Sequence, residues 1–191
     1  EEMCQVLGEF AQIMKAYRVK DYRAYATSAM REARNNQIIL DQIRVRTGIT
    51  VRIISNSEQR FISYKAIAAK AGEFNKIIQK GTAIVDVGFG SAQLSLFDKD
   101  SLVTTQNLPL GTLRVRGLLA NIPATVAEHR EHIEEIVDNE LFTFRKMYLK
   151  DREINNLIGI GENILYIINR MDLKAYGDRI DAAAMNRFYE R

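Results

Sequence analysis

The chain has 191 residues, of which 47% are hydrophobic and 27% are charged, in the range of ordinary globular proteins rather than disordered or fibrous ones. Its net charge of +3 permits contact with anions, but the arginines are dispersed and indicate no specific nucleic-acid partner. No apolar run of about 18 residues is present, so we expect no membrane span.

The single cysteine bears on the cellular compartment of the protein, and the first residue bears on whether the sequence is part of a longer chain. Cys4 is the single cysteine and cannot form an internal disulfide, which fits a reducing cytoplasm. Because the sequence begins at Glu1 and opens directly on a helical pattern, we expect it to be cut from a longer chain. Its length permits one domain or two small lobes.

Helices and strands alternate in the first part of the chain. Apolar residues at three- and four-residue spacings mark the helices, and β-branched or aromatic runs mark the strands. We expect Asn36 to cap a helix and Gly48 to end it in the left-handed conformation. In chain order the expected elements are a helix over 2–17, a strand over 22–26, a helix over 29–34, a helix over 37–47, a strand over 50–54 and a helix whose apolar face runs from 61 to 71.

The second part of the chain has a different order. Residues 72–80 lack clear periodicity and are expected to connect two lobes. Three consecutive strands should then form an antiparallel meander, which a purely Rossmann-type winding would not contain. The expected elements are strands over 83–87, 94–97 and 101–107, a helix after Gly111, a long helix over 123–148, a strand over 154–158 and a helix over 163–171.

Five segments of the chain resemble known sequence motifs. Residues Ala26–Asn35 resemble an ATSA-x-R-x-A-x-N segment, and Ile54–Gln59 an I-S-G-x-E-E helix entry. Residues Asp86–Gln93 are similar to a phosphate loop, D-I-G-G-G-S-T-E. Residues Pro109–Arg114 resemble P-L-G-x-x-R, and Gly159–Asn163 occupy the place of a third loop, G-x-G-G-T. In this order the segments resemble the exopolyphosphatase and guanosine pentaphosphate phosphohydrolase (Ppx/GppA) family.

The resemblance implies an α/β fold of the actin-like ATPase (ribonuclease H-like) type, in which two lobes of mixed sheet are flanked by helices. Residues 1–80 would be the remainder of an incomplete first lobe. Residues 81–191 would form the second lobe, and the last helix could return to the first. The loop that starts at Asp86 should join two adjacent antiparallel strands.

The resemblance also implies a phosphate site and a magnesium ion. Glycine lets backbone N–H groups approach phosphate oxygens, and an arginine fork matches phosphate geometry. For Arg114 we favour a structural role at a helix start. Asp86 is the candidate Mg²⁺ ligand, acting through water. The expected phosphate-binding residues are Arg31, Gly88, Gly90, Ser91, Gly159 and Gly161.

Three of the departures from the family pattern bear on the chemistry. Gln59 and Gln93 stand where the family has the two glutamates that orient or deprotonate the attacking water, so with Asp86 they would form a degenerate catalytic site. A carboxamide can position water but cannot take its proton. Two alternatives would restore activity. Glu58 could substitute for Gln59, which requires a turn of about 100° around the helix and is less favoured than loss of activity, or a glutamine could suffice, as in phosphohydrolases that only position the water. Glu162 replaces a glycine and brings a negative charge to the third loop.

Three functional hypotheses follow. The first is a metal-assisted hydrolase of polyphosphate or guanosine pentaphosphate. The second is a degenerate member of the family that binds or senses such phosphate-chain anions without turnover. The third, an actin-like sugar kinase or ATPase, shares the fold but not the ATSA-x-R segment. All three would be cytoplasmic proteins without a membrane or a specific nucleic-acid partner, and whether the protein forms a homodimer stays open.

Overall fold

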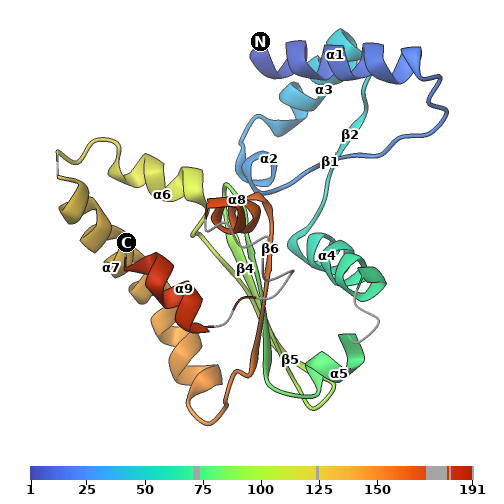
Figure 1. Cartoon of the computed structure of the whole chain (residues 1–191). Coiled ribbons are helices and arrows are strands. Elements are labelled where there is room, and N and C mark those ends of the chain that lie inside the picture. Colours follow the sequence, from blue (N-terminus) through green and yellow to red (C-terminus); the bar gives the residue numbers. More distant parts are fainter. Residues whose placement is uncertain (71–73, 124, 171–179, 181, 191) are drawn as a thin grey trace. The chain divides into compact units, whose positions relative to one another are not determined.

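The computed structural model describes residues 1–70, 74–123, 125–170, 180 and 182–190. The chain forms two compact units, Glu1–Ala71 and Gly72–Arg191. Both units combine helices with a β-sheet, and Figure 1 labels most of their elements.

The first unit has a small parallel sheet covered by helices. Strands β1 and β2 pair in parallel, with Ala24 opposite Val51. Helix α1 lies beside α3 (Figure 1), and Ile43, Ile49 and Ile54 form the buried core. The elements are α1 (Glu2–Ala16), β1 (Ala24–Ala26), α2 (Ser28–Glu32), α3 (Asn36–Thr47), β2 (Val51–Ile53) and α4 (Asn56–Lys70).

The ends of α3 test two of the expected caps. Gly48 has a φ of 72° and its N–H donates to the Arg44 carbonyl at 2.9 Å, so the predicted left-handed stop is confirmed. The predicted cap at Asn36 is wrong, because α3 already includes this residue and Asn35 is the N-cap. The Asn36 side chain instead donates to the Met30 carbonyl at 3.3 Å, which ties α3 to α2.

The second unit is built on a four-stranded mixed sheet with the order β5-β4-β3-β6. The meander β3-β4-β5 is antiparallel, and β6 adds to β3 in parallel. The elements are α5 (Phe74–Ile78), β3 (Thr82–Val87), β4 (Ala92–Asp98), β5 (Ser101–Leu108), α6 (Thr112–Leu119), α7 (Val126–Phe144), a π-helical turn η1 (Arg145–Leu149), β6 (Asn156–Ile160), α8 (Glu162–Arg170) and α9 (Ala182–Tyr189).

Strand β4 lies between β3 and β5 and forms the centre of this core, where Leu96 and Phe97 are buried. The turn between β4 and β5 has positive φ angles at Lys99 and Asp100, which matches the right-handed twist of a two-residue hairpin. Helices α7 and α9 lie side by side (Figure 1).

The antiparallel meander and the order of the predicted elements are confirmed. Strand β6 begins two residues later than predicted, because its pairing with β3 aligns Asn156 with Thr82 and the Asn156 amide donates to the Thr82 hydroxyl at 3.3 Å.

The sequence patterns do not predict the short helices α5 and α9. The predicted connection over 72–80 lies partly outside the described residues, and its described part contains α5. Among the described residues, no helix has the length and apolarity needed to cross a membrane.

We expect Gly48→Ala to destabilise the protein by about 1 kcal/mol, because an L-residue is strained at a positive φ. Gly8→Ala is the matched control: Gly8 lies within α1 and has no atom within 4 Å of the place that an added Cβ would take, and alanine favours helix. Urea unfolding curves of both variants measure the difference. Equal effects of the two substitutions would contradict the strain argument.

Candidate functional site

The loop Gly88–Ser91 joins β3 to β4, which confirms the expected strand-loop-strand arrangement. Its carbonyl groups are bonded to the start of α6. The Thr112 N–H donates to the Gly88 carbonyl at 3.1 Å, and the Leu113 N–H to the Phe89 carbonyl at 2.9 Å. The loop is thus held by backbone hydrogen bonds from outside its own hairpin.

Arg114 completes this attachment. Its Nε donates to the Gly90 carbonyl at 2.7 Å, and its backbone N–H donates to the Phe89 carbonyl at 3.3 Å. Within the loop, the Gly88 N–H donates to the Ser91 carbonyl at 3.0 Å. Arg114 lies near the start of α6, as expected, and there it binds the loop.

Asp86 and Gln93 are directly opposite each other in the β3-β4 ladder, so their side chains share one face of the sheet. Asp86 is half-buried, whereas Gln93 is only 3% exposed. Among the described residues, neither Oε1 nor Nε2 of Gln93 has a hydrogen-bond partner. A buried carboxamide without partners is costly, and functional sites are where proteins retain such groups.

The third glycine-rich segment meets the same end of β3. Gly161 has a φ of 100°, and a Cβ there would lie 3.3 Å from the Asp86 Oδ1 atom. The Asn163 side chain donates to the Val87 carbonyl at 2.6 Å. Gly159 lies inside β6, where a Cβ would be 3.1 Å from the Ile164 side chain. Glu162 is exposed at the start of α8.

The first unit brings together Arg31 and Gln59. The Arg31 guanidinium donates to the Ile54 carbonyl at 2.7 Å, to the Asn56 side-chain oxygen, and to Gln59 Oε1 at 3.5 Å. Partial burial lowers the pKa of Arg31, and the Glu32 carboxylate acts in the opposite direction; an arginine nevertheless keeps its charge. The structure therefore holds a cation against Gln59, and two separate sequence motifs meet in one cluster.

Glu58 is committed to other partners. Its Oε1 accepts from Arg52 at 2.6 Å, and its Oε2 accepts from the Ser55 N–H at 2.9 Å. The Ser55 hydroxyl accepts from the Glu58 N–H at 3.1 Å, which completes a capping box at the start of α4. These contacts, the Arg52 bond first, lower the pKa of Glu58. They oppose the alternative in which Glu58 replaces the missing glutamate.

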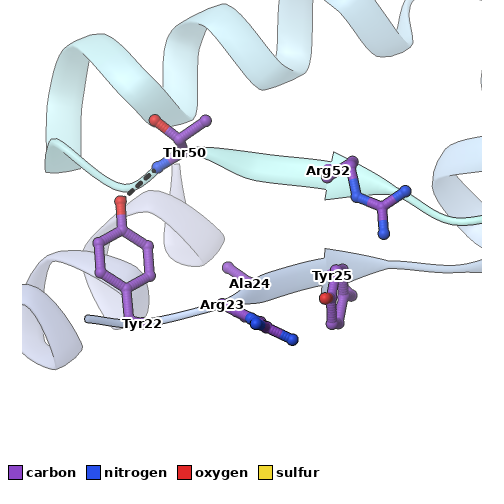
Figure 2. A pocket seen from close by; sticks show the side chains of 6 residues that line it. All are labelled: Tyr22, Arg23, Ala24, Tyr25, Thr50 and Arg52. Atoms are coloured by element: carbon purple, nitrogen blue, oxygen red, sulfur yellow. Dashed lines mark hydrogen bonds between the residues drawn. The ribbon is translucent and has the colours of Figure 1, made fainter. Parts of the chain in front are cut away.

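A cavity of about 330 Å³ lies on the β1-β2 sheet and is formed by two tyrosines, two arginines and two small residues (Figure 2). Figure 2 shows the Tyr22 hydroxyl, which accepts from the Thr50 N–H at 2.9 Å. Arg52 lies 5.1 Å from the centre of the Tyr25 ring and is ion-paired with Glu58. None of the predicted site residues lines this cavity.

The donor set around Asp86 fits a magnesium ion that keeps most of its waters. Among the described residues, no group of three or more histidine, cysteine, aspartate or glutamate side chains could enclose a metal. Mg²⁺ is commonly held by one or two carboxylates together with substrate phosphates. The half-buried Asp86 carboxylate, opposite the buried Gln93 carboxamide, is a ligand of that kind.

Sequence reasoning missed three contacts that the structure adds to these clusters. Asn56 binds Arg31, Asn163 holds the end of β3, and Gly111 allows α6 to approach the loop. A Cβ at Gly111 would lie 2.2 Å from the Gly90 carbonyl carbon. The motif P-L-G-x-x-R contained the signal for Gly111, but only the tertiary contact explains it.

The sequence matches the Ppx/GppA phosphatase family over residues 1–191, and the chain belongs to this family. Exopolyphosphatase 1 of Mycobacterium leprae is 28% identical over 116 residues, which are 60% of this chain and 33% of that protein. A bifunctional 3-dehydroquinate synthase/phosphatase of Fusobacterium nucleatum is 22% identical over 117 residues, 60% of this chain and 17% of that protein. The chain thus spans a third or less of these curated relatives.

Solved structures show the same fold. An exopolyphosphatase from Cytophaga hutchinsonii superposes with a TM-score of 0.77 at 18% identity, covering 97% of this chain and 61% of that one. The Aquifex aeolicus Ppx/GppA phosphatase gives a TM-score of 0.63 at 19% identity, covering 99% of this chain and 62% of that one. The predicted α/β fold of the actin-like type is confirmed.

We expect Glu58→Gln to remove an acid-sensitive part of the stability. The folded-state pKa of Glu58 lies below its ordinary value of 4.5, so its stabilisation is present above that pH and is lost as the pH falls through the lowered pKa. The difference in thermal midpoint between wild type and variant should therefore shrink on acidification. Arg52→Gln should weaken the same pH dependence, and a difference that grew at low pH would contradict the expectation.

We expect Gln93→Met to raise the free energy of unfolding by about 1 kcal/mol, since it replaces a buried carboxamide that has no partner in the described part of the chain by an apolar side chain of similar size. Denaturant unfolding measures the change. Gln106→Met on β5 is the control, because Gln106 is only half-buried in the same sheet. A destabilised Gln93→Met protein would show that the carboxamide is satisfied in the folded state.

Proposed function

We propose that this protein binds phosphate-chain anions through the loop Gly88–Ser91 and has an impaired capacity to hydrolyse them. The proposal rests on the surroundings of the two glutamines. Gln59 contacts Arg31, Gln93 is buried opposite Asp86, and Glu58 is held by Arg52 and Ser55. The nearest carboxylate in the sequence is therefore engaged elsewhere and does not take over the proton-accepting role at Gln59.

The chemistry of the proposal follows from what these side chains can do. Hydrolysis of a phosphoanhydride requires water to attack in line and to lose a proton. A glutamine Oε1 can accept a hydrogen bond from water, but a carboxamide cannot accept its proton. Asp86 would hold a Mg²⁺ ion, which would neutralise phosphate charge. Binding and positioning of the anion would therefore remain, whereas proton removal would be lost.

A second candidate is slow hydrolysis in which the Asp86 carboxylate serves as the base. The favouring observation is that Asp86 is half-buried and directly opposite Gln93, which would place it beside a water held by the carboxamide. A carboxylate that holds Mg²⁺ is a weaker base, because the cation stabilises its charged form. This competition favours binding over turnover.

Long-chain polyphosphate is the ligand that we propose. The curated relatives of Mycobacterium bear the name exopolyphosphatase. The loop in the second unit offers backbone N–H groups, and Arg31 in the first unit offers a guanidinium. Both kinds of donor recognise phosphate oxygens without requiring a base or a sugar. Guanosine pentaphosphate is the alternative, and competition between the two ligands would rank them.

We expect the full-length protein to release little phosphate from long-chain polyphosphate with magnesium, and Gln59→Glu combined with Gln93→Glu to raise the rate. The gain should approach about 10² to 10⁴, the usual contribution of a general base. A buried carboxyl group introduced at position 93, opposite Asp86, would have a raised pKa, which suits a base near neutral pH. Phosphate release is measured at equal folded fraction, verified by circular dichroism.

Two results would decide against this proposal in different ways. Rapid turnover by the wild-type protein would refute impaired hydrolysis. A folded double variant that binds polyphosphate but stays inactive would show that the glutamines are not what limits the reaction. Gln106→Glu serves as the control, because it adds a carboxylate to a neighbouring strand of the same sheet without occupying either family position.

A further inference from the structure

We infer that the start of α6 is a positioning element for the neighbouring loop. It turns the N–H groups of Phe89, Gly90 and Ser91 together toward a bound anion. Gly111 and Arg114 are the residues that set this orientation. The inference rests on the proposed function, because it concerns the loop through which phosphate would bind. It assigns a role to residues that do not themselves touch the anion.

The orientation follows from three consecutive carbonyls. Those of Gly88, Phe89 and Gly90 all accept hydrogen bonds from α6 residues, from the N–H groups of Thr112 and Leu113 and from Arg114 Nε. In a trans peptide the carbonyl and the N–H of the same plane point in opposite directions. Fixing these carbonyls on α6 therefore turns the following N–H groups, those of residues 89, 90 and 91, away from α6.

These three N–H groups are not used for hydrogen bonds within the described part of the chain. Among the described residues, no acceptor takes a hydrogen bond from the N–H of Phe89, Gly90 or Ser91. The neighbouring Gly88 N–H is different, since it donates to the Ser91 carbonyl and closes the hairpin. Successive N–H groups that point the same way form a site for an anion.

The same hydrogen bonds determine whether the start of α6 can itself bind an anion. The first N–H groups of a helix lack partners within the helix and commonly bind anions. Here those of Thr112, Leu113 and Arg114 donate to loop carbonyls. The N–H groups that would bind an anion are therefore those of the loop and not those at the start of α6.

Gly111 is required because the two segments nearly touch. A Cβ at this position would lie 2.2 Å from the Gly90 carbonyl carbon and 2.3 Å from the Phe89 oxygen. These neighbours are backbone atoms, so they cannot move away without breaking the bonds to α6. The φ of Gly111 is −74°, which any residue adopts, so its need for glycine comes from this approach alone.

The test compares Gly111→Ala with Gly117→Ala. Both substitutions add one methyl group to glycines of the same region, but Gly117 lies within α6 with no atom within 4 Å of the added carbon. We expect Gly111→Ala to weaken binding of inorganic tripolyphosphate by about tenfold or more, as loss of one or two hydrogen bonds implies. Gly117→Ala should bind like the wild type. Calorimetric titration of the full-length protein gives the affinities.

Arg114→Lys is a second variant that keeps the positive charge but removes the Nε–H donor. We expect an intermediate loss of affinity, which a role of Arg114 through charge alone would not produce. This variant also keeps the test decisive if Gly111→Ala fails to fold. Wild-type affinity in the Arg114→Lys protein, together with unchanged binding by a folded Gly111→Ala protein, would overturn the inference.

Hydrogen exchange of the wild-type protein provides a readout that does not require binding. The N–H groups of residues 112–114 should exchange slowly, and those of residues 89–91 rapidly until tripolyphosphate slows them. The opposite pattern in the free protein would overturn the inference. A wild-type protein with the expected pattern that binds no tripolyphosphate would refute the proposed function instead.

Discussion

The second unit depends on one constraint, which is that the loop between β3 and β4 must satisfy its carbonyl groups outside its own hairpin. A loop next to a ligand cannot leave backbone groups unpaired at no cost. The start of α6 provides donors for Gly88, Phe89 and Gly90, and Asn163 provides one for Val87. Two elements far apart in the sequence thereby fix one short segment, so the N–H groups of residues 89–91, which have no acceptor within the described ranges, have a defined direction.

Sequence patterns predicted the elements well wherever local chemistry decides them. Gly48 ends α3 because only glycine tolerates its conformation easily, and apolar runs bounded by turn residues placed β3, β4 and β5 correctly. The start of β6 was misplaced because its register depends on Asn156 meeting Thr82, a contact between residues 74 positions apart. Short helices such as α5 carry too few residues for a clear period.

The sequence predicted candidate site residues that the structure brings together in two pairs, but it did not predict the contacts that support them. Motif order identified Arg31 and Gln59, which the first unit brings within 3.5 Å, and Asp86 and Gln93, which pair across two strands. The packing that requires glycine at position 111 could not be predicted, because a need for glycine at an ordinary φ arises from a neighbour that sequence spacing does not reveal. The lack of a hydrogen-bond partner for the Gln93 carboxamide among the residues that the structure describes likewise depends on which polar groups the fold brings near it.

The two glutamines act in the same direction under the proposed function. A glutamate at either position would bring a negative charge toward a polyanion, and at position 93 this charge would also oppose Asp86 across the ladder. Glutamine removes that repulsion and leaves an oxygen that can still accept a hydrogen bond from water. Under the proposed function, the change that would take away the general base would therefore also favour retention of the anion, because affinity for the ligand and proton removal from water place opposite demands on the charge at these two positions.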